Sequence, residues 1–134
     1  MKNIVKILSI FATLLILAPF TWGAIHGVLD PIAASTAFGL PAKDDVGAFF
    51  VRVYLSRNFV IIVVALVFLL RQQWASLATL MTVSILLPIF DATVLTQQLG
   101  HGAPLTIHIG TIIALALLST LLWVHTANVR RESR

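Results

Sequence analysis

Three ionisable residues, Arg57, Asp91 and His108, lie within stretches of sequence that are otherwise strongly apolar. Each side chain can take part in chemistry. Aspartate and histidine accept and donate protons, and arginine stabilises a developing negative charge. Ionisable groups are rare in apolar surroundings because burying a charge without a partner is costly. We therefore take Asp91, His108 and Arg57 as the candidate catalytic residues of the chain.

Further polar residues extend this set. Tyr54 and Asn58 are one helical turn apart beside Arg57, so they can hydrogen-bond in the same region. Asp91 shares a helix face with Ser84, seven residues earlier. The candidate ligand-binding residues are Tyr54, Arg57, Asn58, Asp91, His108 and His26. Two other histidines, His101 and His125, lie at the ends of apolar stretches and are expected to face water or lipid headgroups.

The composition indicates that lipid surrounds most of the chain. The sequence has 134 residues, of which 59% are hydrophobic and only 10% are charged, whereas soluble domains carry roughly 25% charged residues. A chain of this length cannot hide so much apolar surface in a water-soluble core, because small domains bury the smallest fraction of their surface. There are no cysteines, which excludes disulfides and thiolate chemistry. The net charge of +4 does not indicate nucleic-acid binding, because the basic residues cluster at the chain ends.

Four segments are long enough to cross a bilayer, which requires about 20 apolar residues in a helix. They cover residues 7–29, 46–70, 74–96 and 103–124. None shows the alternation of apolar and polar residues that a membrane strand requires. The longest connector contains a small apolar segment, Ile32 to Leu40, that suits a short helix at the interface. The predicted fold is an all-α transmembrane four-helix bundle, forming one domain, with a short interfacial helix in the first loop.

The distribution of lysine and arginine predicts the orientation. With four spans, both termini and the Arg71 turn share one side, and basic residues mark the cytoplasmic side. That side holds Lys2, Lys6, Arg71, Arg130, Arg131 and Arg134. We expect a bacterial inner-membrane protein with both termini in the cytoplasm. In the alternative, the first span is a cleaved secretory signal.

The spans bring the three ionisable residues to similar depths. Arg57 lies fourteen residues before Arg71, about 21 Å along a helix from the cytoplasmic boundary. Asp91 lies seventeen residues after Trp74, about 25 Å from the same boundary, and His108 is about one turn inside the opposite end of the last span. Pro88 removes a helical hydrogen bond and is expected to bend the third span just below Asp91.

Two interpretations of this polar cluster stay open. Arg57 and Asp91 can neutralise each other as an ion pair that fixes helix packing, since a buried charge is tolerated mainly when it is paired. Alternatively, the cluster is a working site. No ligand-spaced metal motif, cofactor motif or phosphate-binding loop is present, so no metal or cofactor is expected.

The sequence also resembles a known family. The residues that carry the resemblance are Pro31, Phe38-Gly39-Leu40-Pro41, Phe50-Val51-Arg52, Arg57-Asn58, Pro88-Ile89-Phe90-Asp91 and His108. This pattern resembles the small multi-pass membrane proteins grouped as domain of unknown function 4267, over nearly the whole chain. The resemblance implies a multi-pass membrane protein and places Arg57, Asp91 and His108 in its recurring polar set.

Three functions fit these observations. The first is a membrane bundle whose polar cluster packs the helices or binds a small apolar, lipid-like ligand. The second is an intramembrane acid/base enzyme, of isomerase or cyclase type, acting on a lipid or isoprenoid. The third is a small transporter working as a homo-oligomer, with Asp91 as its coupling carboxylate. The expected partners are the lipid bilayer, an apolar small molecule and further copies of the chain.

Overall fold

The computed structural model describes residues 2–132 and contains helices and no strand within that range. The elements in chain order are α1 (Lys2–Leu29), α2 (Pro31–Phe38), α3 (Asp45–Leu70), α4 (Trp74–Ser84), α5 (Leu86–Leu99), the short 3₁₀ helix η1 (Gly100–Gly102) and α6 (Thr106–Glu132). Four stretches are long and apolar enough to cross a membrane: Asn3–Leu29, Asp45–Leu70, Trp74–Gly102 and Thr106–Arg131. The predicted all-α bundle of four spanning segments is confirmed.

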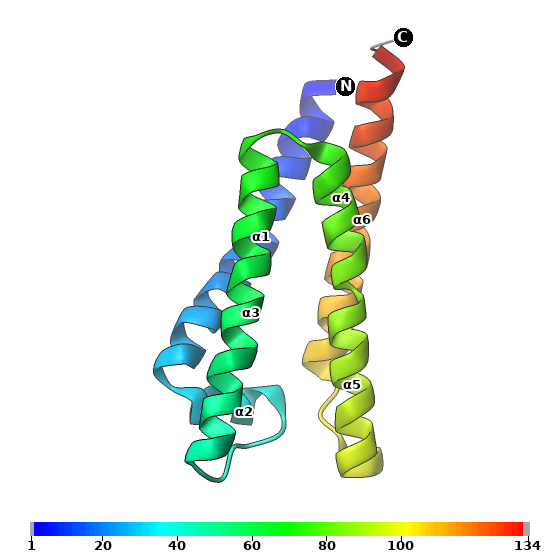
Figure 1. Cartoon of the computed structure of the whole chain (residues 1–134). Helices are drawn as coiled ribbons and strands as arrows, with labels where there is room; N and C mark the ends of the chain where they lie inside the picture. The colour runs from blue at the N-terminus through cyan, green and yellow to red at the C-terminus, as the bar shows by residue number, and fades with distance from the viewer. Residues whose placement is uncertain (1, 133–134) are drawn as a thin grey trace.

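The bundle consists of two pairs of long helices. α1 packs along α3, and α4 packs along α6, with α1 also contacting α6. Both termini and the α3–α4 turn lie at one end of the molecule, and α2 lies at the other (Figure 1). From the turn, α3 and the α4–α5 segment diverge toward the α2 end. This divergence leaves room between the two pairs for the cavity described below.

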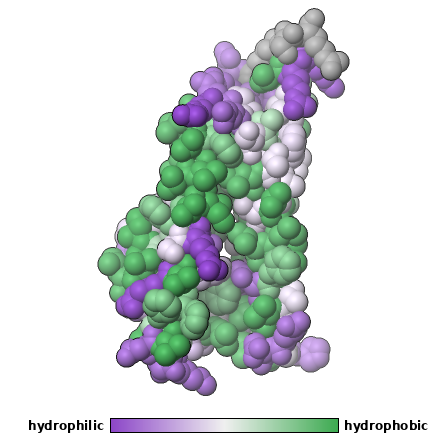
Figure 2. All heavy atoms as spheres, in the orientation of Figure 1, coloured by the Kyte–Doolittle hydropathy of each residue, from purple (hydrophilic) through white to green (hydrophobic). Residues whose placement is uncertain are grey.

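The best-packed part of the core lies toward the end that holds the termini. Leu77, Ala65 and Ala78 are fully buried there, at 0% exposure. Small residues such as these alanines let helices approach closely, which is the main source of helix association in lipid. Figure 2 shows mostly hydrophobic side chains over the middle of the molecule, with one hydrophilic group beside a hollow, and hydrophilic side chains at its two ends. This distribution matches a bundle whose outer surface faces lipid.

The third span is broken at Ile85, one turn before the proline that was expected to bend it. Pro88 has no N–H, so it cannot donate to the carbonyl of Ser84 four residues earlier. α4 ends at Ser84, and Ile85 N–H donates to the nearer Thr82 carbonyl at 3.3 Å before α5 begins. The break lies close to Asp91, as the sequence predicted.

The short helix α2 has clear start and stop signals. Asp30 Oδ1 accepts a hydrogen bond from Ala33 N–H at 3.0 Å, and Pro31 is the first helical residue. Gly39, with φ +105°, ends the helix in the left-handed conformation that favours glycine. The helix therefore covers residues 31–38 rather than 32–40. It packs against α1 and α3 rather than standing alone.

Three further details differ from expectation at the span ends. α5 continues through Gln97 and Gln98 to Leu99, which shortens the expected loop. α6 begins at Thr106, so Pro104 lies outside the helix although the fourth predicted span begins at residue 103. The prediction for His125 was wrong, because α6 continues through the basic tail and holds this residue 5% exposed, with its ring 4.4 Å from that of Trp74.

Candidate functional site

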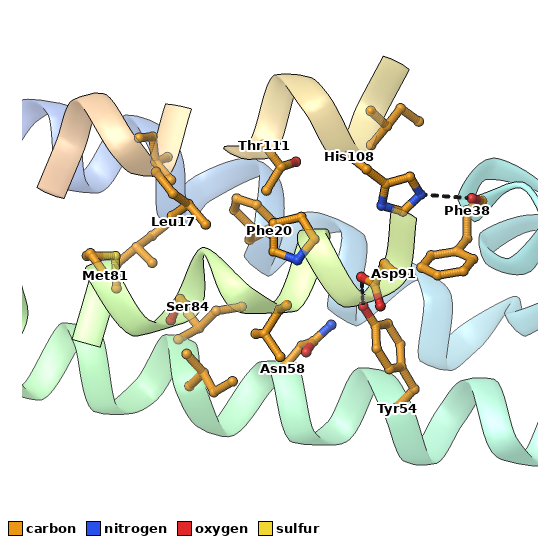
Figure 3. Close-up of a pocket in the computed structure, with 17 residues that line it drawn as sticks. Leu17, Phe20, Phe38, Tyr54, Asn58, Met81, Ser84, Asp91, His108 and Thr111 are labelled. Atoms are coloured by element: carbon orange, nitrogen blue, oxygen red, sulfur yellow. Dashed lines mark hydrogen bonds between the residues drawn. The ribbon is translucent and has the colours of Figure 1, made fainter. Parts of the chain in front are cut away.

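A cavity of about 200 Å³ lies between the two helix pairs. It extends from the packed core toward α2, and all six α-helices contribute to its wall. Most of the lining is apolar, and the polar side chains are Tyr54, Asn58, Ser84, Asp91, His108 and Thr111. Figure 3 shows Tyr54, Asp91 and His108 together at one end and Leu17 and Met81 toward the other. The cavity therefore has one polar end and an apolar remainder.

Asp91 is half-buried on α5, and its partner is Tyr54 of α3. The Tyr54 hydroxyl donates a hydrogen bond to Asp91 Oδ2 at 2.9 Å across the space between the diverging helices (Figure 3). A hydrogen bond to a carboxylate is stronger than one between neutral groups. This bond joins α3 to α5, which belong to different helix pairs.

His108 is buried on α6, and its ring is fixed by the end of α2. Nε2 lies 3.2 Å from the carbonyl oxygen of Phe38. A carbonyl can only accept, so Nε2 carries the proton, and Nδ1 of the neutral ring is an acceptor. The Phe38 ring meets the His108 ring edge-on, with centroids 5.0 Å apart, and meets the Tyr54 ring at 5.8 Å. Phe38 thus contacts residues on both sides of the polar end.

Helix periodicity explains the other polar residues of the lining. Asn58 lies one turn after Tyr54 on α3, and Ser84 lies two turns before Asp91 on the third span, as the sequence predicted. Thr111 lies one turn after His108 and was not predicted, although its spacing from that histidine was a usable signal. No sequence pattern pointed to the rings of Phe20 and Phe38 as part of a site.

Arg57 lies outside the cavity, although it was expected to belong to the polar cluster. Its side chain is exposed on α3 and does not line the cavity wall. Between residues 2 and 132 no salt bridge joins Arg57 to Asp91; the carboxylate bonds to Tyr54 instead. With 3.6 residues per turn, Arg57 is about 60° around the helix from Tyr54, on the side away from Asn58. The structure thus brings Asp91 and His108 together and leaves Arg57 apart.

His26 is also outside the cavity. It is exposed near the end of α1, where its ring lies 3.9 Å from the ring of Trp22. Arg52 of α3 contacts the same end of α1. Its Nε donates a hydrogen bond to the carbonyl of Val28 at 3.3 Å. A cation at this position provides a hydrogen bond to a carbonyl at the carboxyl end of α1 and interacts favourably with the negative end of the helix dipole.

The cavity wall contains two ionisable side chains at its polar end, Asp91 and His108. Asp91 is the one acidic side chain in the lining, and no lysine or arginine lines it. Within the part of the chain that the structure describes, no group of three histidine, aspartate or glutamate residues is placed to hold a metal ion. The residues of the cavity wall can therefore form hydrogen bonds, attract a positive charge through Asp91 and transfer protons.

Four apolar spanning segments around a cavity with one polar end define a multi-pass helical membrane protein. The chain belongs to the family described as Domain of unknown function (DUF4267), whose model matches residues 18–122. The matched range includes every residue that lines the cavity except Ile16 and Leu17. The comparisons with curated proteins and with solved structures give no match.

Proposed function

We propose that the protein binds a small, largely apolar, lipid-like molecule in the cavity between its helix pairs. The polar group of this ligand would lie against Asp91 and His108, and its apolar part along the wall formed by α1, α4 and α6. The observation that carries the proposal is the cavity itself, with a single polar end in an apolar wall. Ligand sites commonly combine an apolar lining with a few convergent polar groups.

A role in packing alone explains this arrangement less well. Protein interiors are close-packed, whereas this bundle leaves a cavity of about 200 Å³ between its helix pairs. A bundle selected only for packing would close this space with larger side chains. The Tyr54–Asp91 hydrogen bond joins α3 and α5 across the cavity without filling it.

The ligand would come from the bilayer. α3 and α5 diverge from the turn that joins α3 to α4 (Figure 1), and Figure 2 shows a hollow between them. Large apolar side chains are exposed on both helices, including Phe59 and Phe90. A molecule dissolved in the membrane could reach the cavity sideways without crossing water. As part of this proposal, the protein resides in a bacterial inner membrane with both termini in the cytoplasm.

The second candidate is an intramembrane acid/base enzyme, favoured by the presence of Asp91 and His108 in one cavity. Either group could move a proton during isomerisation or cyclisation of a lipid or isoprenoid. Tyr54, hydrogen-bonded to Asp91, would orient the carboxylate. Arg57 has no role in this enzyme mechanism, because it does not line the cavity.

A ligand-recovery experiment tests the proposal. The protein is extracted directly into nanodiscs with its native lipids, and co-purifying apolar molecules are identified by mass spectrometry. Leu115→Trp fills the cavity, because Leu115 is buried in its wall. Leu117→Trp is the matched control, because Leu117 is on the same helix but 68% exposed.

We expect at least one molecule to be enriched with the wild type and with Leu117→Trp, and to be depleted with Leu115→Trp. Thermal unfolding of all three proteins confirms that they are folded. Identical lipid profiles from the two tryptophan variants would contradict the proposal. Conversion of the recovered molecule by wild type but not by His108→Gln would select the enzyme.

A further inference from the structure

The polar end of the cavity contains one carboxylate, that of Asp91. Asp91 Oδ2 accepts the Tyr54 hydroxyl, while no described residue donates a hydrogen bond to Oδ1. No lysine or arginine lines the cavity, and the neutral donors Asn58, Ser84 and Thr111 carry no full charge. In an apolar medium, a carboxylate is stabilised by a positively charged partner.

His108 adds a second acceptor at the same end. Its Nε2 donates to the Phe38 carbonyl, so Nδ1 can accept a hydrogen bond when the imidazole is neutral. Figure 3 shows this second ring nitrogen on the side of the imidazole away from Phe38. The carboxylate of Asp91 and Nδ1 of His108 can therefore both accept hydrogen bonds from a ligand.

Two aromatic rings lie at the same end of the cavity as this acceptor pair (Figure 3). Phe38 and Tyr54 both line the cavity, and the Phe38 ring contacts the rings of Tyr54 and His108. The faces of aromatic rings attract cations, and groups of aromatic rings are a recurrent arrangement for binding organic ammonium ions. The two rings are therefore compatible with a cationic ligand.

We propose that the ligand is an amphiphilic amine, whose protonated nitrogen lies between Asp91, His108 Nδ1 and the aromatic rings. This inference rests on the proposed function and names the chemical class that the site takes. The ammonium N–H groups donate to the Asp91 carboxylate and to Nδ1, and the charge balances that of Asp91. The apolar chain lies along Leu17 and Met81 or leaves between α3 and α5. An anionic head would meet the Asp91 charge with no cation to offset it.

Three probes with the same chain and different heads test the assignment: octylamine, octanol and octanoate. Each is titrated calorimetrically into phosphatidylcholine nanodiscs containing the protein, and the signal of protein-free nanodiscs is subtracted. Asp91→Asn removes the charge at nearly constant size. Asp45→Asn is its matched control, because it removes an exposed carboxylate at the start of α3.

We expect octylamine to bind the wild type and Asp45→Asn at least tenfold more tightly than octanol, and octanoate to bind weakest. Asp91→Asn should lower octylamine affinity at least tenfold and change octanol affinity by less than threefold. Phe38→Leu should lower octylamine affinity severalfold and leave octanol affinity unchanged, which gives a second result if Asp91→Asn does not fold.

Two outcomes separate the inference from the proposed function. Equal binding of octylamine and octanol, unaffected by Asp91→Asn and Phe38→Leu but lost in Leu115→Trp, overturns the amine assignment and leaves a binding cavity. If no probe binds the wild type better than Leu115→Trp, the proposed function fails together with the inference.

Discussion

The partner of Asp91 determines how the polar cluster is interpreted. An ion pair with Arg57 would make the cluster a device for holding helices together. In the structure, Asp91 bonds to the neutral Tyr54 hydroxyl, and the arginine lies outside the cavity. Asp91 is therefore not held in an ion pair with Arg57. Two predictions at the scale of single residues follow from this arrangement.

Arg57→Gln should leave the free energy of unfolding unchanged within about 0.5 kcal/mol or should raise it, because an exposed side chain with no partner among the described residues contributes little. Removal of a charge from the apolar part of a membrane helix is itself favourable. If an Arg57–Asp91 ion pair held the bundle, the same change would cost about 3–5 kcal/mol. Unfolding in mixed detergent and dodecyl sulfate micelles measures the difference.

Tyr54→Phe should destabilise the protein by about 0.5–1.5 kcal/mol, the usual net value of one hydrogen bond. Asp91→Ala combined with Tyr54→Phe should cost less than the sum of the two single changes, because both remove the same bond. Full additivity in the same unfolding assay would show that the bond contributes nothing.

At the scale of elements, two glycines set how closely the helices approach. A Cβ on Gly27 of α1 would collide with Leu55 of α3 and would lie 2.8 Å from the Ala34 Cβ of α2. Gly39 ends α2 with φ +105° and so fixes where Phe38 presents its carbonyl to His108. Both glycines shape the cavity end, although neither lines it.

Gly27→Ala should destabilise the bundle by about 1–3 kcal/mol, since overpacking forces side chains and backbone to shift. The matched control is Gly23→Ala, one turn earlier on α1, where an added Cβ meets nothing within 4 Å. That control should be neutral or stabilising by up to about 1 kcal/mol, because alanine is the better helix former. The same loss of stability in both variants would contradict the close approach at Gly27.

Gly39→Ala should cost about 1–2 kcal/mol, because a left-handed residue with a Cβ is strained. It should also displace the Phe38 carbonyl from His108, which a change in the His108 Nε2 nitrogen chemical shift would report. Gly102→Ala is the control, because this glycine has open space around it and no left-handed φ. An unchanged Nε2 shift in Gly39→Ala would rule out the α2 end as the support of His108.

At the scale of the whole molecule, the orientation in the membrane has a direct test. The chain contains no cysteine, so single cysteines can be introduced without background labelling. Lys43 and Gln73 are exposed in connectors at opposite ends of the bundle. With cytoplasmic termini, a membrane-impermeant maleimide added to intact bacterial cells should label Lys43→Cys. It should label Gln73→Cys only after permeabilisation, and the reverse pattern would invert the proposed topology.

The sequence alone determined the fold class. Segments of about 20 apolar residues in a chain with few charges can only be helices in lipid, because every backbone polar group must be satisfied within the segment. Helical periodicity likewise placed Ser84 with Asp91 and Asn58 with Tyr54. The break near Pro88 followed from the missing N–H of proline. These are local properties, so they can be derived from residue order.

The tertiary structure decided which of the polar residues meet. Depth in the membrane follows from position along a helix, and it placed Arg57, Asp91 and His108 at a common level. Arg57 is about 60° around α3 from Tyr54 by helical periodicity alone. Which of the two faces Asp91 depends on the rotation of each helix about its axis, and therefore on packing against its neighbours. Asp91 therefore pairs with Tyr54, and His108 with Phe38 of a helix seventy residues away. The sequence determines the depth of each residue in the membrane. The direction in which each side chain points is decided only when the helices pack together.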